Sequence, residues 1–324
     1  MSISPLNARR QDIRDRFKRY FTVLYTPFLT NGEIDEEGLR HNVETTIALP
    51  GVGGLSVHSI HQEFWTLTQT ERYQVTEIVL DTVAGRVPTI VGVSDTTVQN
   101  VVDQARHAGE CGADAVMIWP PYYGPKTADG IQKFYETVAA RIDCGFFVYS
   151  TTLTELGFYL TPSMVKTLLP IDNLVGVQNS TMDFSAYAAV MEAVGGSISV
   201  ATSLEEYFLL GKMVYPDIAP DFMMGSSRPL LVQNAEHPRC GRFIDHALAG
   251  DMQQASAQLR EIVSIAQKLQ SRYFAKGFHH LALSKVLSAH LGLKGGDLRP
   301  PGGALDPDEL RECHEIMRQA KLIA

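Results

Sequence analysis

The chain has 324 residues, of which 45% are apolar and 20% are charged, and its formal net charge is −8 at pH 7. This length is sufficient for a large α/β domain with a full hydrophobic core. The negative charge excludes a general nucleic-acid-binding protein, because no basic stripe is left to neutralise phosphates. The most basic segment, residues 9–19, is interpreted as a solvated helix.

The cysteines and the N-terminus both point to a cytoplasmic protein. Cys111, Cys144, Cys240 and Cys313 are too far apart in sequence for a Cys-x-x-Cys redox or zinc motif. They are typical of reduced thiols. The first ten residues lack the apolar core of a signal peptide, and no apolar run reaches the roughly 18 residues that span a bilayer. We therefore expect a cytoplasmic protein that binds neither membranes nor nucleic acids.

Strand and helix patterns alternate along the first half of the chain. Residues 8–18 carry alternating charges and predict a short helix. Short apolar runs predict strands at residues 20–26, 51–58, 87–93, 114–119 and 145–150. Asp35 is a predicted N-cap of a helix that extends to about residue 48, and Thr68 forms a predicted capping box with Glu71. Further helices are predicted at residues 97–109 and 127–142.

The second half continues the alternation and then becomes helical. Thr161-Pro162 predicts a helix start, because proline suits the first helical position. A sixth strand begins at Leu174, a seventh covers residues 197–201, and an eighth lies within residues 213–224. Helices are predicted at residues 183–193, 243–250, 252–269 and 277–291, and a last helix extends from its predicted N-cap Asp306 to about residue 321.

Eight successive βα units predict a parallel sheet and favour a closed (β/α)8 TIM barrel, an α/β fold, with a C-terminal helical appendage. We expect an N-terminal helical segment at residues 1–19, the barrel at residues 20–240, and C-terminal helices packed on the barrel at residues 241–324.

Motifs of other enzyme classes are incomplete in this sequence. The glycine-rich run at Gly51 precedes a strand instead of following one, so it does not match a dinucleotide-binding fingerprint. His314 lacks the second histidine of a zinc helix. Ser163 and Lys166 match the S-x-x-K pattern, but helix capping explains Ser163.

The sixth strand carries the most informative polar residue. The apolar run of residues 174–177 ends in Gln178, Asn179 and Ser180. This pattern is typical of a buried parallel strand that reaches a functional edge. The Gln178 amide can donate and accept hydrogen bonds, but it cannot titrate near neutral pH and cannot form an imine.

Several segments together resemble the dihydrodipicolinate synthase/N-acetylneuraminate lyase family of class I aldolases, in the family's order and spacing. They are Thr26-Pro27-Phe28, Gly53-Gly54-Leu55 followed by Glu63 and Leu67-Thr68, Gly112-Ala113-Asp114-Ala115, Pro121-Tyr122-Tyr123, Val148-Tyr149, Val175-Gly176-Val177 and Arg299-Pro300-Pro301. The resemblance implies a (β/α)8 barrel with a C-terminal helical appendage, usually a homotetramer.

The departures from the family pattern concern its chemistry. The family's Schiff-base lysine follows the sixth-strand Gly-Val pair, where this chain has Gln178. The family's Gly-Thr-Thr-Gly-Glu loop after strand two, which holds a keto-acid carboxylate, reads Ser-Ile-His-Gln-Glu at residues 59–63. The carboxylate-binding arginine of some members has no counterpart within residues 150–157. Tyr149 aligns with the tyrosine that shuttles protons, and Tyr123 with one that neighbouring subunits exchange.

The reactive groups of such a barrel lie at the C-terminal ends of its strands. The predicted catalytic residues are Tyr149, His61, Gln178 and Tyr123, and the predicted substrate-binding residues are Glu63, Asn179, Ser180, Thr26, Trp119 and Ile60. We expect Tyr149 and His61 to transfer protons, because phenol and imidazole can exchange them. Gln178 and Asn179 should polarise a substrate oxygen as neutral donors.

Several of these residues can also be explained by purely structural roles. Glu63 is also explained as an acceptor for backbone N–H groups that caps the next helix, and His58 and His61 as hydrogen-bonded structural residues. The aromatic side chains at the barrel mouth are also explained by packing. A metal bound by His58, His61 and Glu63 is conceivable in ligand type. We nevertheless predict no metal and no cofactor.

Three functions remain open at this point. The first is a lyase-like enzyme that cleaves, forms or hydrates bonds of a carbonyl-containing small molecule without a lysine Schiff base, or a hydrolase on the same scaffold. The second is a catalytically silent barrel that binds a ligand or regulates a partner. The third is an aldolase that uses another lysine, with Lys126 as the candidate nearest the mouth. We expect a small-molecule substrate and a homo-oligomer, either a dimer or a tetramer.

Overall fold

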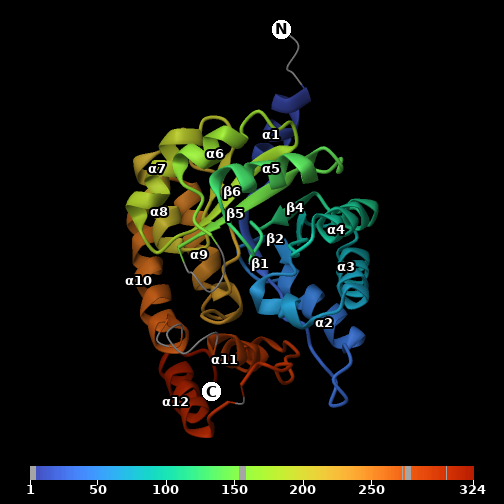
Figure 1. The fold of residues 1–324 in the computed structure, drawn as a ribbon. Helices are drawn as coiled ribbons and strands as arrows, with labels where there is room; N and C mark the ends of the chain where they lie inside the picture. The colour runs from blue at the N-terminus through green and yellow to red at the C-terminus, as the bar shows by residue number, and fades with distance from the viewer. Residues whose placement is uncertain (1–4, 153–157, 272, 274–278, 304) are drawn as a thin grey trace. The chain divides into compact units, whose positions relative to one another are not determined.

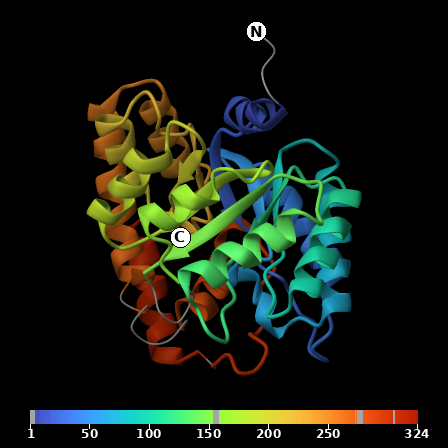
Figure 2. The same cartoon turned by 45° about the horizontal axis from the view of Figure 1, so that its top comes forward.

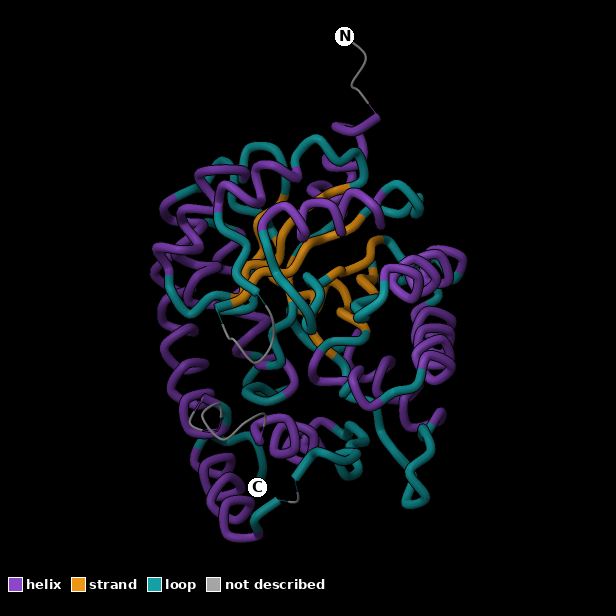
Figure 3. Tube along the Cα trace, in the orientation of Figure 1, coloured by secondary structure: helices purple, strands orange, loops and turns teal. Residues whose placement is uncertain are grey.

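The structure is a computed structural model that describes residues 5–152, 158–271, 273, 279–303 and 305–324. Within these residues eight parallel strands form a nearly closed barrel with helices between them, which confirms the predicted (β/α)8 TIM barrel (Figure 1). The strands, orange in Figure 3, are β1 (Arg19–Val23), β2 (Val52–Val57), β3 (Thr89–Gly92), β4 (Ala115–Ile118), β5 (Phe146–Thr151), β6 (Leu174–Ser180), β7 (Ser199–Ala201) and β8 (Phe222–Met224). Their order in the sheet is β7-β6-β5-β4-β3-β2-β1-β8.

Helices follow the strands and form the C-terminal segment. They are α1 (Pro5–Arg16), α2 (Glu36–Ile47), α3 (Gln69–Val83), α4 (Val98–Glu110), α5 (Ala128–Ala139), α6 (Pro162–Leu168), α7 (Phe184–Val194), α8 (Glu205–Val214), α9 (Arg239–Leu248), α10 (Met252–Leu269), α11 (His279–Leu287) and α12 (Pro307–Gln319). Short 3-10 helices are η1 (Ile60–Gln62), η2 (Phe64–Thr66), η3 (Arg228–Leu230) and η5 (Ser288–Leu291). The predicted N-caps Asp35 and Asp306 and the capping box of Thr68 with Glu71 are all confirmed.

One predicted strand boundary was wrong, one strand is longer than its apolar run, and one helix was missed. Strand β1 ends at Val23 instead of residue 26, and β6 extends three residues beyond its apolar run, to Ser180. The longer β6 follows from its pairing with β5, which continues to the pair Thr151 and Ser180. The eighth strand, β8, lies within the predicted residues 213–224, which confirms that prediction, but helix α8 before it was not predicted. No side chain caps its first turn, so the sequence lacked the usual start signal for that helix.

The chain divides into two compact units, each described below by itself. The first unit comprises residues 1–21 and 88–225, and the second comprises residues 22–87 and 226–324. The three sequential domains expected from the sequence stay a prediction.

Aromatic side chains fill the core of the first unit. Phe17 stacks on Phe21 at 4.5 Å between ring centroids and meets Phe222 edge-on at 5.5 Å. Helix α1, dark blue in Figure 2, is held by Arg10, which donates hydrogen bonds to the carbonyl oxygens of residues 169, 171 and 174. The guanidinium therefore satisfies carbonyl groups that lie just before β6 and at its start.

The second unit has its own apolar core. Val23 and Tyr25 pack there with Leu230 and Leu293, so the end of β1 contacts the segment that follows α11. No helix of the described residues is both long enough and apolar enough to cross a membrane.

Candidate functional site

Two neighbouring strands of the first unit place the predicted residues Tyr149 and Gln178 side by side. In the register of β5 and β6, Tyr149 lies opposite Gln178 and Thr151 lies opposite Ser180. Alternate residues of a strand face the same side of the sheet, so these four side chains share one face. We call them, together with Trp119, the β5–β6 cluster.

Two glycines allow this close packing. Gly176 lies opposite Phe147, and a Cβ atom at Gly176 would collide with the Phe147 ring and approach the Ser199 carbonyl oxygen to 2.7 Å. Gly225 follows β8 with a φ of +86°, and a Cβ atom there would lie 2.5 Å from Nε2 of Gln178. The Gln178 side chain therefore lies directly against the backbone that leaves β8.

The hydrogen bonds of Gln178 decide what its amide can offer a ligand. Nε2 donates to the Met224 carbonyl oxygen at 3.0 Å and to Oγ of Ser180 at 3.3 Å. The carbonyl acceptor sets the orientation of the amide, because a carbonyl oxygen cannot donate. Both amide hydrogens are thus engaged, and Oε1 is left to accept. The predicted role as a donor to a substrate oxygen would require these bonds to break.

Tyr149 is buried and held between an aromatic ring and hydroxyl groups. Its ring stacks on Trp119 at 4.3 Å between centroids, with 12° between the planes. Burial raises the pKa of Tyr149, whereas side-chain hydrogen bonds with Ser180 and Thr151 act in the opposite direction. The phenol is therefore protonated near neutral pH and can serve as a proton or hydrogen-bond donor. Oγ of Ser180 also lies 3.2 Å from Oγ of Ser203, which extends the network.

Two predicted residues of this unit lie apart from the cluster. Asn179 alternates to the other face of β6, where it is fully buried and its amide has no hydrogen-bond partner among the described residues. Tyr123 lies between β4 and α5 with 82% of its surface exposed. The structure thus groups Tyr149, Gln178, Ser180 and Trp119, and separates Asn179 and Tyr123 from them.

The predicted histidine His61 belongs to the second unit. It lies in η1, two residues after the N-cap Ser59. Its ring centroid is 6.3 Å from that of Tyr25 and 6.2 Å from that of His280. Burial and, to a smaller extent, the nearby His280 lower the pKa of His61 to about 3. The imidazole is therefore neutral at physiological pH and only a weak base, which limits its value as a general acid or base.

Glu63 forms a buried ion pair that the sequence did not reveal. Its Oε1 accepts a hydrogen bond from Nζ of Lys285 on α11 at 2.7 Å, and its Oε2 accepts one from the backbone N–H of Arg299 at 3.0 Å. Lys285 also donates to the Asp297 carbonyl oxygen, and it lies 4.5 Å from the centroid of the Phe28 ring. Burial lowers the pKa of Lys285, while Glu63 opposes this shift. Both carboxylate oxygens of Glu63 are thus occupied by the protein.

The other predicted residues of this loop make structural contacts. Oγ1 of Thr26 donates to the Gln62 carbonyl oxygen at 3.2 Å. Nε2 of His58 lies 2.9 Å from both the Arg72 carbonyl oxygen and Oγ1 of Thr76. Ile60 is half-buried at the start of η1. Helix α3 is capped by Thr68 with Glu71, so Glu63 does not cap it. Across the described ranges, no three His, Cys, Asp or Glu side chains are grouped to hold a metal ion.

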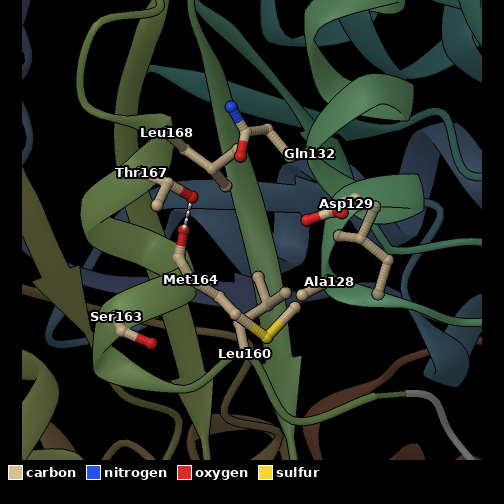
Figure 4. Close-up of a pocket in the computed structure, with 9 residues that line it drawn as sticks. Ala128, Asp129, Gln132, Leu160, Ser163, Met164, Thr167 and Leu168 are labelled. Carbon is tan, nitrogen blue, oxygen red and sulfur yellow. Dashed lines mark hydrogen bonds between the residues drawn. The ribbon is translucent and has the colours of Figure 1, made fainter.

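A separate surface groove of about 120 Å³ lies between α5 and α6 in the first unit (Figure 4). Ser163 of the S-x-x-K pattern lines it with Met164 and Asp129. Helix α6 is N-capped by Thr161, so the capping role predicted for Ser163 was wrong. Oγ of Ser163 lies 3.2 Å from Oγ1 of Thr161, a hydroxyl group that cannot act as the base for a nucleophile.

The family model described as the dihydrodipicolinate synthetase family matches residues 16–320. This chain belongs to that family. The chain is 27% identical over 307 residues to a 4-hydroxy-tetrahydrodipicolinate synthase of Phenylobacterium zucineum, covering 95% of this chain and 98% of that protein. It is 32% identical over 186 residues to the enzyme of that name from Nitratidesulfovibrio vulgaris, covering 57% of this chain. The chain spans 63% of the length of that protein and 58% of the relative from Protochlamydia amoebophila.

Solved structures share the fold. The dihydrodipicolinate synthase from Oceanobacillus iheyensis superposes with a TM-score of 0.81 at 23% identity, covering 96% of this chain and 99% of that one. The N-acetylneuraminate lyase from Mycoplasma synoviae gives a TM-score of 0.79 at 20% identity, covering 94% and 98%.

None of the residues that form the β5–β6 cluster of this family member is a lysine. Lys18 and Lys212 both pair with Asp221, the residue just before β8. Lys166 lies on α6 and Lys212 lies on α8. Lys126 lies between β4 and α5.

Proposed function

We propose that this family member is a lyase-like enzyme that acts on a carbonyl-containing small molecule without a lysine Schiff base. The observation that carries the proposal is the geometry of Gln178, an amide beside Tyr149 whose two hydrogens are committed to Met224 and Ser180. Membership of the dihydrodipicolinate synthetase family supports the lyase-like part. An amide nitrogen has no lone pair comparable to that of an amine, so it cannot attack a carbonyl.

Tyr149 is the proposed proton-transfer group. Without an imine, the charge that develops on a carbonyl oxygen must be stabilised by hydrogen-bond donors. The Tyr149 hydroxyl, protonated and linked to Ser180 and Thr151, is suited to this task. Loss of one general acid typically lowers the rate by about a hundredfold to ten-thousandfold. Tyr149→Phe should therefore lower turnover by at least about a hundredfold with the fold intact.

Steady-state kinetics on the variants tests this assignment once turnover of a carbonyl substrate is detected. Tyr215→Phe is the matched control, because Tyr215 bonds Glu192 just after α8. His61→Ala tests the predicted second proton-transfer residue, with circular dichroism as a check on folding. Near-full activity in both Tyr149→Phe and His61→Ala would rule out the mechanism and favour the catalytically silent barrel.

Borohydride trapping tests the proposed absence of imine chemistry. The protein is incubated with pyruvate, reduced with borohydride and measured by intact mass, and no adduct is expected. A stable adduct on any lysine would refute the proposal, and Lys126 would be the first residue to map. The side chain of Lys285 is fully buried and paired with Glu63, which hinders its attack on a carbonyl. Gln178→Lys should not create pyruvate lyase activity, because the loop at residues 59–63 also differs from the family pattern.

Association into a dimer or tetramer is part of the proposed function. Tyr122 and Tyr123 follow β4 with 44% and 82% of their surfaces exposed, which leaves an aromatic pair in water. Contact with a second copy would cover this pair.

A further inference from the structure

We infer that the β5–β6 cluster binds a neutral carbonyl compound that carries hydroxyl groups, and that it discriminates against 2-oxo acids. The inference rests on the proposed function, because it assumes that this cluster is where the carbonyl substrate binds. It names the class of substrate, which the proposed function leaves open.

The first argument is the hydrogen-bonding character of Gln178. Its Nε2 hydrogens are donated to Met224 and Ser180, so Oε1 is the atom that can meet a ligand. A carboxylate is an acceptor only, so its approach to Oε1 would bring two acceptors together. A hydroxyl group carries a proton that Oε1 can accept. Position 178 therefore favours an alcohol over a carboxylate in the ligand.

The second argument is the set of hydroxyl groups around Ser180. Tyr149 and Thr151 bond within this network, and Oγ of Ser203 lies 3.2 Å from Oγ of Ser180. A hydroxyl group can act as donor or acceptor by rotating its hydrogen. A row of such groups can match alternating donors and acceptors on a polyhydroxylated ligand. None of these groups carries a charge that would compensate the desolvation of a carboxylate.

The third argument is the charge at the C-terminal ends of the strands. Five carboxylates and one cation lie at these strand ends among the described residues. They belong to the segments that connect β3, β4, β5, β6 and β7 to the helices that follow, or to the first turns of those helices. The carboxylates are Asp95, Asp129, Asp183, Glu205 and Glu206, and the cation is Lys126. Recognition of a substrate carboxylate usually relies on a positive partner. The local field of this unit therefore opposes an anionic substrate.

Helix N-termini do not reverse this conclusion. Their partial positive charge attracts anions, but at α7 and α8 it is complemented by the protein's own carboxylates. Asp183 accepts a hydrogen bond from the backbone of α7, and Glu205 and Glu206 lie in the first turn of α8. Little of the charge at these two helix N-termini is thus left for a ligand.

Two probes of the same size and carbon skeleton test the inference. Pyruvate and hydroxyacetone are three-carbon ketones that differ in a carboxylate and a hydroxymethyl group. Isothermal titration calorimetry on the wild-type protein measures binding without requiring turnover, so it is independent of whether the protein is a lyase. We expect tighter binding of hydroxyacetone than of pyruvate. Equal or tighter binding of pyruvate, or no binding of hydroxyacetone up to about 0.1 M, would overturn the inference.

Variants then assign the preference to Gln178. Gln178→Met keeps the length of the side chain but removes the acceptor, and one net hydrogen bond corresponds to about a two- to twelvefold change in Kd. Hydroxyacetone affinity should fall by this factor while pyruvate affinity does not fall. The control is Gln132→Met on α5, whose amide bonds Glu136, and it should leave both affinities unchanged. Unchanged hydroxyacetone affinity in Gln178→Met would contradict the assignment.

A third variant tests for a hidden anion site. Lys126→Gln removes the cation from the strand ends of this unit and should not weaken hydroxyacetone binding. If pyruvate binds the wild type well and this binding is lost in Lys126→Gln, the site takes anions and the inference fails. Hydroxyacetone binding without bond cleavage would instead leave the inference standing and count against the proposed lyase function.

Discussion

Protonation of His61 should make the stability of the second unit depend on pH. The imidazole is buried against Tyr25 and His280, and its pKa is lowered from 6.5 to about 3. Between these two values the unfolded chain binds a proton that the folded chain does not. The free energy of unfolding therefore falls as the pH falls from about 6.5 toward 3, and this contribution is constant above 6.5.

The magnitude follows from the width of the window. Each pH unit below 6.5 costs about 1.4 kcal/mol for one such group. At pH 5 the cost is about 2 kcal/mol relative to pH 7.5. Glu71, whose pKa is lowered from 4.5 by its hydrogen bond with Arg299, loses its stabilising contribution only below pH 5, so it does not affect a comparison between pH 7.5 and pH 5.

Urea unfolding at pH 7.5 and pH 5, followed by circular dichroism, measures the effect. His61→Leu has similar volume and no titrating group, and it removes two ring nitrogens that have no hydrogen-bond partner among the described residues. The variant should be at least as stable as the wild type at pH 7.5, and more stable by about 2 kcal/mol at pH 5. His246→Leu, at the half-exposed end of α9, is the matched control. If His61→Leu and the wild type lose the same free energy between the two pH values, the reasoning is wrong.

Three further predictions concern packing and assembly. Gly225→Ala should destabilise the protein by at least about 1 kcal/mol more than Gly124→Ala in urea unfolding. Both glycines have a positive φ, but only a Cβ atom at Gly225 would meet another side chain. Equal losses of stability in the two variants would contradict this prediction. Lys285→Met should lower the free energy of unfolding by about 3–5 kcal/mol, because it leaves Glu63 buried and unpaired. The double variant with Glu63→Gln should lose less than the sum of the losses in the two single variants. Additive losses would show that the two residues are not coupled. The wild type should be a dimer or tetramer by light scattering, and Tyr123→Ser should shift it toward the monomer. A wild-type monomer at micromolar concentration would refute the expected interface.

Local signals carried much of the fold prediction. The N-caps Asp35 and Thr68 act through hydrogen bonds to residues three positions away, so neighbouring residues are sufficient to predict them. The apolar runs of the strands are likewise local, and their regular alternation with helices indicated the barrel. The prediction missed helix α8, where Leu204 provides no side-chain cap. It gave no end for the sixth strand, whose length depends on its pairing with β5.

The amino-acid sequence alone determined that position 178 is an amide at the end of the sixth strand and that Tyr149 belongs to the fifth, because both follow from strand patterns and residue type. Only the tertiary structure decided how that amide is used, since its hydrogens go to Met224, 46 residues away, as well as to Ser180. It also decided that Glu63 pairs with Lys285, 222 residues later in the chain. Burial, which sets the pKa of His61, depends on packing with α11. Contacts between distant segments arise from the packing of the whole fold, and no local pattern encodes them.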